Sequence, residues 1–179
     1  MSDITRVIKE GEFADYPQQP HGGKLVDAVL KDKELEDALK RVADLPAIMI
    51  DMEAVITVEM IATGVLSPND GFMDEANYKS VLSKGRLTNG LIWPVPLSFA
   101  PTGDRNKLVV DSLSVGDEVA LIDEGKNPIA ILTLNDIFSY DREDRAEKLF
   151  GTTDRDHPGV DAIYRLMGDT ALGGPIKLL

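Results

Sequence analysis

The sequence contains no cysteine, and its 179 residues include only two histidines and one tryptophan. Without cysteine, the chain can form no disulfide, no thiolate metal site and no cysteine nucleophile. No apolar run approaches the roughly 20 residues that a membrane-spanning helix needs. The first residues, 1–5, lack the basic flank and apolar segment of a signal peptide, so we expect a cytoplasmic protein without a membrane partner.

Basic residues are also scarce, because 19 lysines and arginines stand against 31 acidic residues and leave a net charge of −12. The excess of acidic over basic residues favours solubility and opposes loose binding to nucleic acid. The length suits one domain with a real core, and an apolar content of 43% is ordinary for a globular protein. Residues 1–19 are polar and weakly patterned, so we expect a poorly packed tail there, followed by one domain over residues 20–179.

The most distinctive stretch runs from Leu66 to Pro96 and holds the only tryptophan and three of the ten prolines. Its pairs Ser67-Pro68 and Asp70-Gly71 are turn signals, because proline fixes φ and glycine tolerates a positive φ. Apolar residues follow the second turn at once, which indicates that the chain enters a core there. We therefore expect a positive φ at Gly71 and largely buried side chains at Phe72, Met73 and Trp93.

Helical periodicity follows this turn. Asp74 can cap a helix in which Tyr78, Val81 and Leu82 recur at i, i+3 and i+4. Gly85 fits as the left-handed residue that ends it. Downstream, the acidic residues Asp141, Glu143 and Asp144 lead into a helix that ends at Phe150-Gly151, and Pro158 suits the first position of another helix.

Two helices are expected upstream. Lys31–Leu45 is amphipathic, with inward positions at Leu35, Ala38, Leu39, Val42 and Leu45. Glu36 and Lys40 can form an ion pair on its wet face. Asp51 can cap a second helix over Met52–Thr63, which is apolar almost all round, so we expect it to be deeply buried.

Several short apolar runs have the pattern of strands. They are Ala47–Ile50, Lys107–Asp111, Glu118–Ile122, Ile129–Leu134 and Pro175–Leu179, and the proline-rich segment Val95–Phe99 should also be extended. Short strands this close together indicate a small antiparallel barrel. The sequence therefore predicts an α+β fold, with a pseudo-barrel of mostly antiparallel strands and surrounding helices.

The Leu66–Pro96 stretch resembles the N-terminal domain of sulfate adenylyltransferase (ATP sulfurylase), which is a PUA-like pseudo-barrel. Further pieces resemble the same domain in the same order: Pro20–Leu25, Phe150–Asp154, His157–Val160 and Gly173-Gly174. The resemblance runs from about Pro20 to the end of the chain. It implies a PUA-like fold and a part in joining sulfate to ATP, which gives adenylyl sulfate and diphosphate, or in the reverse reaction.

The catalytic segments of that family lie in a nucleotidyltransferase domain that follows this one. They read Gln-x-Arg-Asn, His-x-x-His and Gly-Arg-Asp-His, and this chain has none of them: its only glutamines are Gln18 and Gln19, and its histidines, His21 and His157, are far apart. The run Asp154–His157 resembles the third segment, but an aspartate replaces its glycine. We interpret this run as a turn that starts a helix. We accordingly expect no catalytic, cofactor-binding or metal-binding residue and no cofactor.

Other candidates have plainer interpretations. His21 lies in the Pro20–Gly23 turn and has no second ligand nearby, so we expect a structural role. The residues Asp141, Glu143 and Asp144 are interpreted as a solvated helix cap and not as a metal site. Arg86 and Trp93 suit either contact with a partner domain or a role in the core and its turns.

The leading hypothesis for function is a scaffold and interface for a catalytic domain of ATP sulfurylase, in cis or as a separate chain, with a homo-oligomer formed through the parent enzyme. The apolar C-terminal residues favour a fragment over a stand-alone protein. The alternatives are an RNA-binding PUA-like module, which the acidic charge opposes, and a small-molecule binding domain, for which we find no glycine-rich cradle or charged cluster.

Overall fold

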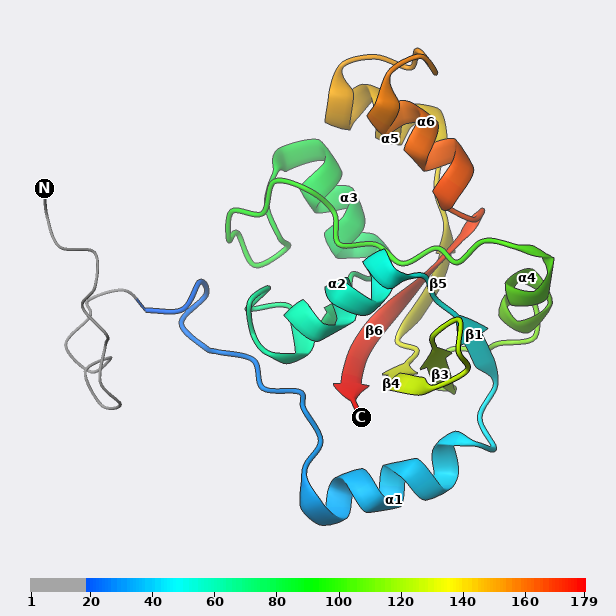
Figure 1. The fold of residues 1–179 in the computed structure, drawn as a ribbon. Coiled ribbons are helices and arrows are strands. Elements are labelled where there is room, and N and C mark those ends of the chain that lie inside the picture. Colours follow the sequence, from blue (N-terminus) through cyan, green and yellow to red (C-terminus); the bar gives the residue numbers. More distant parts are fainter. Residues whose placement is uncertain (1–18) are drawn as a thin grey trace, which may run out of the picture.

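The computed structural model describes residues 19–179 and shows a curled mixed sheet with helices around it (Figure 1). The strands run in the order β1-β3-β4-β6-β2, and β5 also pairs with β6. The strands are β1 Ala47–Met49, β2 Gly71–Phe72, β3 Glu118–Ile122, β4 Pro128–Thr133, β5 Asp136–Ser139 and β6 Thr170–Leu178. The helices are α1 Asp32–Val42, α2 Met52–Ala62, α3 Glu75–Lys84, α4 Asp104–Val110, α5 Arg142–Phe150 and α6 Pro158–Leu166.

The last strand organises the sheet. β6 pairs antiparallel with β2, β4 and β5, and β3 pairs antiparallel with β4, so only the β1–β3 pair is parallel among the named strands. The α+β fold with mostly antiparallel strands is therefore confirmed. The poorly packed tail expected at residues 1–19 lies almost wholly outside the described residues.

The main core fills the space between the sheet and the inner side of α2. Its fully buried side chains include Ile48, Val58, Ile61, Leu121, Leu132, Leu172 and Ile176. Phe72 and Met73 are 5% and 4% exposed, as expected from the turn that precedes them. The residues of the main core come from segments far apart in the sequence, so this core depends on the tertiary fold.

Gly71 does not have a positive φ, contrary to the sequence-based expectation. It lies in β2, opposite Pro175 of β6. A Cβ at this position would overlap the carbonyl oxygen of Gly174 and lie 2.6 Å from the Cα of Pro175. The glycine is therefore required by the close approach of two backbones and not by a left-handed turn.

Trp93 is only partly buried, so the expectation of a largely buried side chain was wrong. It packs against a small cluster of Met73, Val81 and Leu87 beside the main core. Its outer side faces His21, with ring centroids 6.2 Å apart. The two flanking residues, Ile92 and Pro94, are exposed, because this segment runs along the surface.

The segment expected as a strand at Lys107–Asp111 belongs to a helix instead. α4 spans Asp104–Val110, and Lys107 forms an ion pair with Asp111 one turn away. The valines at its end suggested a strand, but the tertiary contacts of Asn106 fix this segment as a helix. The segment 95–99 is not a strand either: only Phe99 forms a bridge, with Leu172.

The helix caps occur where the sequence placed them. The carboxylates of Asp51 and Asp74 accept hydrogen bonds from the backbone N–H groups of Ala54 and Asn77. Gly85 ends α3 with a φ of 62°.

The burial of α1 and α2 is less complete than expected. In α2, Val58 and Ile61 are fully buried, but Met52 is 70% exposed and Ile56 is 49% exposed, because one side of the helix faces outward. In α1, Leu39 is 47% exposed, and Lys40 pairs with Asp37 rather than Glu36. Both helices therefore lie on the outside of the core and contribute one face each.

Candidate functional site

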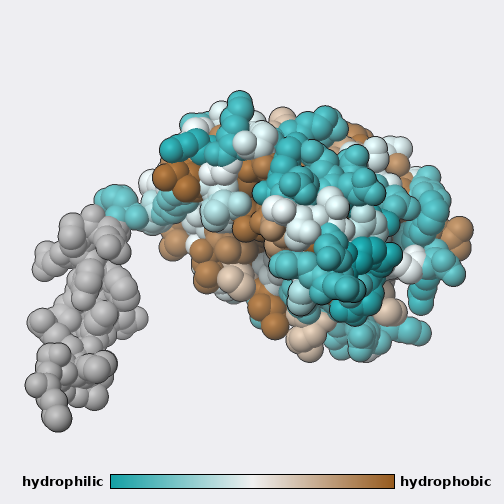
Figure 2. Space-filling view, turned by 90° about the horizontal axis from the view of Figure 1, so that it is seen from above, coloured by the Kyte–Doolittle hydropathy of each residue, from teal (hydrophilic) through white to brown (hydrophobic). Residues whose placement is uncertain are grey.

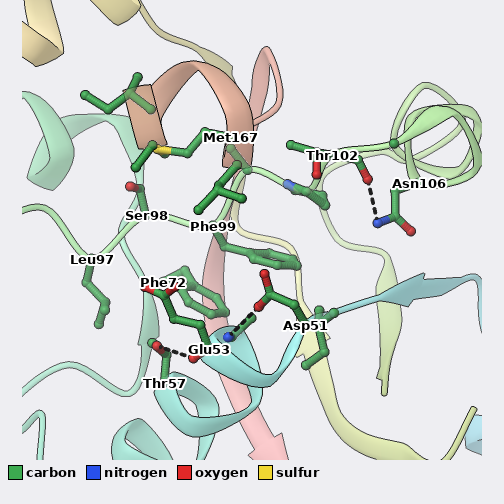
Figure 3. Close-up of a pocket in the computed structure, with 18 of the residues that line it drawn as sticks. Asp51, Glu53, Thr57, Phe72, Leu97, Ser98, Phe99, Thr102, Asn106 and Met167 are labelled. Atoms are coloured by element: carbon green, nitrogen blue, oxygen red, sulfur yellow. Dashed lines mark hydrogen bonds between the residues drawn. The ribbon is translucent and has the colours of Figure 1, made fainter. Parts of the chain in front are cut away.

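A cleft of about 690 Å³ opens between the start of α2, the segment 95–106 and the helix pair α5 and α6 (Figure 3). Its walls come from six separate stretches of the chain. The inner wall includes Phe72, Leu97, Phe99 and Ala100; the α5–α6 wall includes Arg145, Leu149, Ile163, Leu166 and Met167; and the outer rim includes Asp51, Glu53, Asp104, Arg105 and Glu124. No pattern in the sequence indicates that these segments meet.

One side chain fixes the segment 101–106 in place. Asn106 is 9% exposed, and its amide donates to the backbone carbonyls of Met49 and Thr102 at 2.8 and 2.9 Å. Its carbonyl oxygen accepts from the Met49 N–H at 3.0 Å. β3 pairs with one side of β1, and the Asn106 side chain thereby bonds the backbone of Met49 at the end of β1 and holds α4 against the sheet.

The inner wall is aromatic. The rings of Phe72 and Phe99 stack with centroids 4.8 Å apart and an interplanar angle of 21°. Both side chains are more than nine-tenths buried, and their exposed edges line the cleft (Figure 3). Such a wall favours the flat apolar part of a ligand.

Two polar side chains of the cleft have unused hydrogen-bonding atoms. Arg145 is 7% exposed, and its Nε and Nη1 atoms have no partner among residues 19–179. Its guanidinium lies over the ring of Tyr78, 5.5 Å from the centroid. The buried Ser98 hydroxyl also lacks a partner within the described residues. Arg145 lies one turn before Leu149 on the inner face of α5, but no sequence pattern distinguishes it from the other polar residues of that helix.

Two tyrosines near Arg145, the buried Tyr78 and the half-buried Tyr140, remain neutral. Burial raises the pKa of Tyr78, and the Arg145 guanidinium partly offsets that rise. Burial likewise raises the pKa of Tyr140, which Arg142 partly offsets. The hydroxyl of Tyr140 donates to the Gly168 carbonyl at 2.8 Å. Neither tyrosine provides an anion to neutralise Arg145 at neutral pH.

The run Asp154–His157 forms the turn that starts α6, as interpreted from the sequence. The His157 Nδ1 accepts from the Gly159 N–H at 3.2 Å, and the Asp154 carboxylate accepts from the Asp156 N–H at 2.9 Å. Arg155 lies over the ring of Tyr164, 4.5 Å from its centroid. These side chains serve the local backbone and the neighbouring helix.

The remaining sequence candidates also have local roles. The Nε2 of His21 contacts the Ile92 carbonyl at 2.8 Å, and Arg86 donates to the Gly90 carbonyl at 2.9 Å. The Asp141 carboxylate caps α5 by accepting from the N–H groups of Glu143 and Asp144. Within the described range, no group of three or more metal-ligating side chains could hold an ion.

The fold defines the class of protein. A family model described as "PUA-like domain" matches residues 18–179, and the chain belongs to that family. Its curated relatives are sulfate adenylyltransferases: that of Aeropyrum pernix is 42% identical over 161 residues, and that of Symbiobacterium thermophilum is 40% identical over 160. The resemblance inferred from the Leu66–Pro96 stretch is thereby confirmed.

The coverage of these matches is unequal. They span 90% and 89% of this chain but only 41% and 39% of the two relatives, so the chain corresponds to about two fifths of their length. Among solved structures, a hexameric APS kinase from Thiobacillus denitrificans matches with a TM-score of 0.64 and 26% identity, over 89% of this chain and 26% of that one. In the part of this chain that the structure describes, no helix is long and apolar enough to cross a membrane.

Proposed function

We propose that this chain is the N-terminal, non-catalytic domain of a sulfate adenylyltransferase, with residues 20–179 forming the domain. It acts as a scaffold and docks on a catalytic domain, in cis or on a separate chain. One observation carries this proposal: about nine-tenths of the chain aligns with sulfate adenylyltransferases but accounts for about two fifths of their length. The missing Gln-x-Arg-Asn, His-x-x-His and Gly-Arg-Asp-His segments agree with a catalytic centre elsewhere.

A patch of exposed apolar side chains suits such docking. Leu25, Val65 and Ile92 are 60%, 66% and 60% exposed. Their segments adjoin, because the Val26 N–H donates to the Ser67 hydroxyl at 2.9 Å and His21 contacts the Ile92 carbonyl. Figure 2 shows hydrophobic residues gathered at the left of the described part, while hydrophilic residues cover most of the remainder. We call these three residues the apolar patch and propose it as the surface that meets the catalytic domain.

An assay of the isolated chain tests the non-catalytic role. Adenylyl transfer requires cationic and backbone donors around the nucleotide phosphates, and loss of a single preorganised donor typically slows a reaction by ~10²–10³. We expect no release of pyrophosphate from ATP and sulfate by this chain. Turnover that survives stringent removal of host enzyme, and that Arg155→Ala or His157→Ala abolishes, would overturn the proposal.

The parent enzyme is also proposed to be a homo-oligomer. The related structure from Thiobacillus denitrificans is described as hexameric, and this supports assembly at the level of the whole enzyme. Sedimentation of the isolated chain and of the chain joined to its catalytic domain distinguishes the two levels. We expect a monomer for the first and a larger assembly for the second.

A further inference from the structure

The outer side of α2 is apolar and exposed. A helix that is apolar almost all round is normally buried on every side, and α2 has that composition. Its inner side packs on β6 and β2, but Met52 is 70% exposed, Ile56 is 49% exposed and Met60 is partly exposed. These three side chains, which we call the outer stripe, are a face of the helix that residues 19–179 leave uncovered.

Two carboxylates border the outer stripe. At about 100° per residue, Met52, Ile56 and Met60 fall within a sector of about 80° on the helix surface, with Glu53 at one border and Glu59 at the other. Both glutamates are exposed, and within the described residues neither forms an ion pair. Glu59 also stands in the last turn, where the helix macrodipole disfavours a carboxylate and α2 has no basic residue. A cation of a partner would supply the counter-charge.

The outer stripe leads into the apolar patch. The Leu66 N–H donates to the Met60 carbonyl at 3.2 Å, so the chain folds back onto the last turn of α2 and brings Val65 beside it. A Cβ on Gly64 would lie 2.8 Å from the Leu25 Cδ1, which places Leu25 at the same end of the helix. The stripe and the patch are therefore parts of one exposed apolar surface.

We propose that the outer stripe binds a helix of the catalytic domain, one whose apolar side chains are bordered by lysine or arginine. This inference rests on the proposed function and names the kind of element that docks there. An extended segment does not fit, because α2 bonds its own backbone and would leave the N–H and C=O groups of a strand unpaired on that side. Two facing helices keep their backbone bonds internal, and opposite charges at the borders fix their register.

Charge opposes a second copy of this chain as the occupant. In a symmetric dimer the outer stripe would face the same stripe of the other copy. Glu53 and Glu59 would then meet glutamates across the contact, where like charges oppose association. The net charge of −12 on each chain adds to this repulsion. A helix with basic borders meets neither obstacle.

Binding to the rest of the Aeropyrum pernix relative tests the apolar contact. That part is expressed separately, shown by circular dichroism to be folded, and titrated with the 179-residue chain by isothermal calorimetry. We expect Met52→Glu to weaken binding at least ~10-fold, as a central interface contact does. The matched control is Leu108→Glu, at a leucine of α4 that is 74% exposed, and it should bind as the wild-type chain does.

Charge reversal tests the borders of the stripe. Glu59→Lys should weaken binding at least ~3-fold, because an attractive pair becomes a repulsive one, and Glu59→Gln should weaken it less. The difference should shrink as the salt concentration rises. The control is Glu36→Lys, which reverses an exposed carboxylate on α1 and should leave the affinity unchanged.

The outcomes separate this inference from the proposed function. Binding that Met52→Glu and Glu59→Lys leave unaffected, or that the controls weaken equally, would overturn the inference alone. No binding with both chains folded would overturn the inference and the proposed function together, whereas the expected variant effects without any gain in the rate of pyrophosphate release would overturn only the scaffold role. Tighter binding after removal of residues 1–18, or a dimer of this chain that Met52→Glu dissociates, would assign the stripe to another occupant and contradict the proposal.

Discussion

Gly71 shows how strictly a single residue can be constrained by the backbone that faces it. Its Cα packs against Gly174 and Pro175 of β6, where a side chain has no room. We expect Gly71→Ala to lower the free energy of unfolding by about 3 kcal/mol, the upper end for overpacking, because the β2–β6 contact must open. Urea unfolding measures this.

The control for this variant is Gly125→Ala, where the nearest atom to the new Cβ belongs to an exposed side chain, the Asn127 amide at 3.0 Å, and not to a facing backbone. It should change stability by less than ~1 kcal/mol. Equal effects at the two glycines would contradict the close approach of the β2 and β6 backbones at Gly71.

Tyr78 is a second residue with a specific consequence. Its hydroxyl is buried and has no hydrogen-bond partner among the described residues, so Tyr78→Phe should alter stability at pH 7 by no more than about 1 kcal/mol. Burial raises the pKa of Tyr78 above 10.0 in the folded chain. Its contribution to stability is therefore fully present below pH 10, and it is lost as the pH rises through the raised pKa.

Urea unfolding between pH 8 and pH 12 tests the alkaline behaviour. We expect Tyr78→Phe to reduce the fall in stability above pH 10 relative to the wild-type chain. An unchanged slope in the variant would mean that Tyr78 ionises as freely in the folded chain as in the unfolded one. Tyr140 serves as the comparison, because burial raises its pKa as well.

Among the elements, α4 depends most on one side chain. Asn106→Ala would leave the N–H and carbonyl of Met49 without partners and would detach α4 from the end of β1. Each unsatisfied buried group costs about 1–3 kcal/mol, so we expect a loss of about 2–4 kcal/mol.

Hydrogen exchange at Met49 reports this directly. The Met49 amide should lose protection in Asn106→Ala. The Leu121 amide in the centre of the sheet should still exchange only through global unfolding, at the rate that the variant's overall stability sets. Unchanged protection at Met49 would contradict the bridging role of Asn106.

The elements also show where sequence patterns succeed. Caps at Asp51 and Asp74 were predictable, because capping depends on residues three positions apart. The helix α4 was not predictable, because its valines favour a strand. The contact that decides its conformation joins Asn106 to Met49, which is 57 residues away in the sequence. The strand β5 was missed for a similar reason, since its pairing with β6 is set by the fold.

The cleft could not be predicted, because it joins six stretches of the chain that only the tertiary fold brings together. Periodicity assigned no special role to Arg145, because the sequence of α5 is polar along most of its length. The sequence expectation of no binding residue in this chain remains an expectation.

At the scale of the whole molecule, the net charge of −12 sets what the surface attracts. Binding to RNA depends on basic groups that release counter-ions, so we expect no detectable binding of generic single-stranded RNA at physiological salt. Gel shifts at micromolar protein measure this. A saturating shift that weakens steeply with salt would favour the RNA-binding alternative.

We propose that this domain supports catalysis by a partner domain that it contacts through the apolar patch. The most direct measurement is pyrophosphate release by the remaining part of the Aeropyrum pernix relative, expressed as a separate chain and shown by circular dichroism to be folded. Adding this chain should raise its rate until saturation. Val65→Glu should abolish the increase, whereas Leu108→Glu, at an equally exposed leucine on α4, should keep it. No increase in the rate of pyrophosphate release when both chains are folded, or a full increase on addition of Val65→Glu, would contradict this role of the domain.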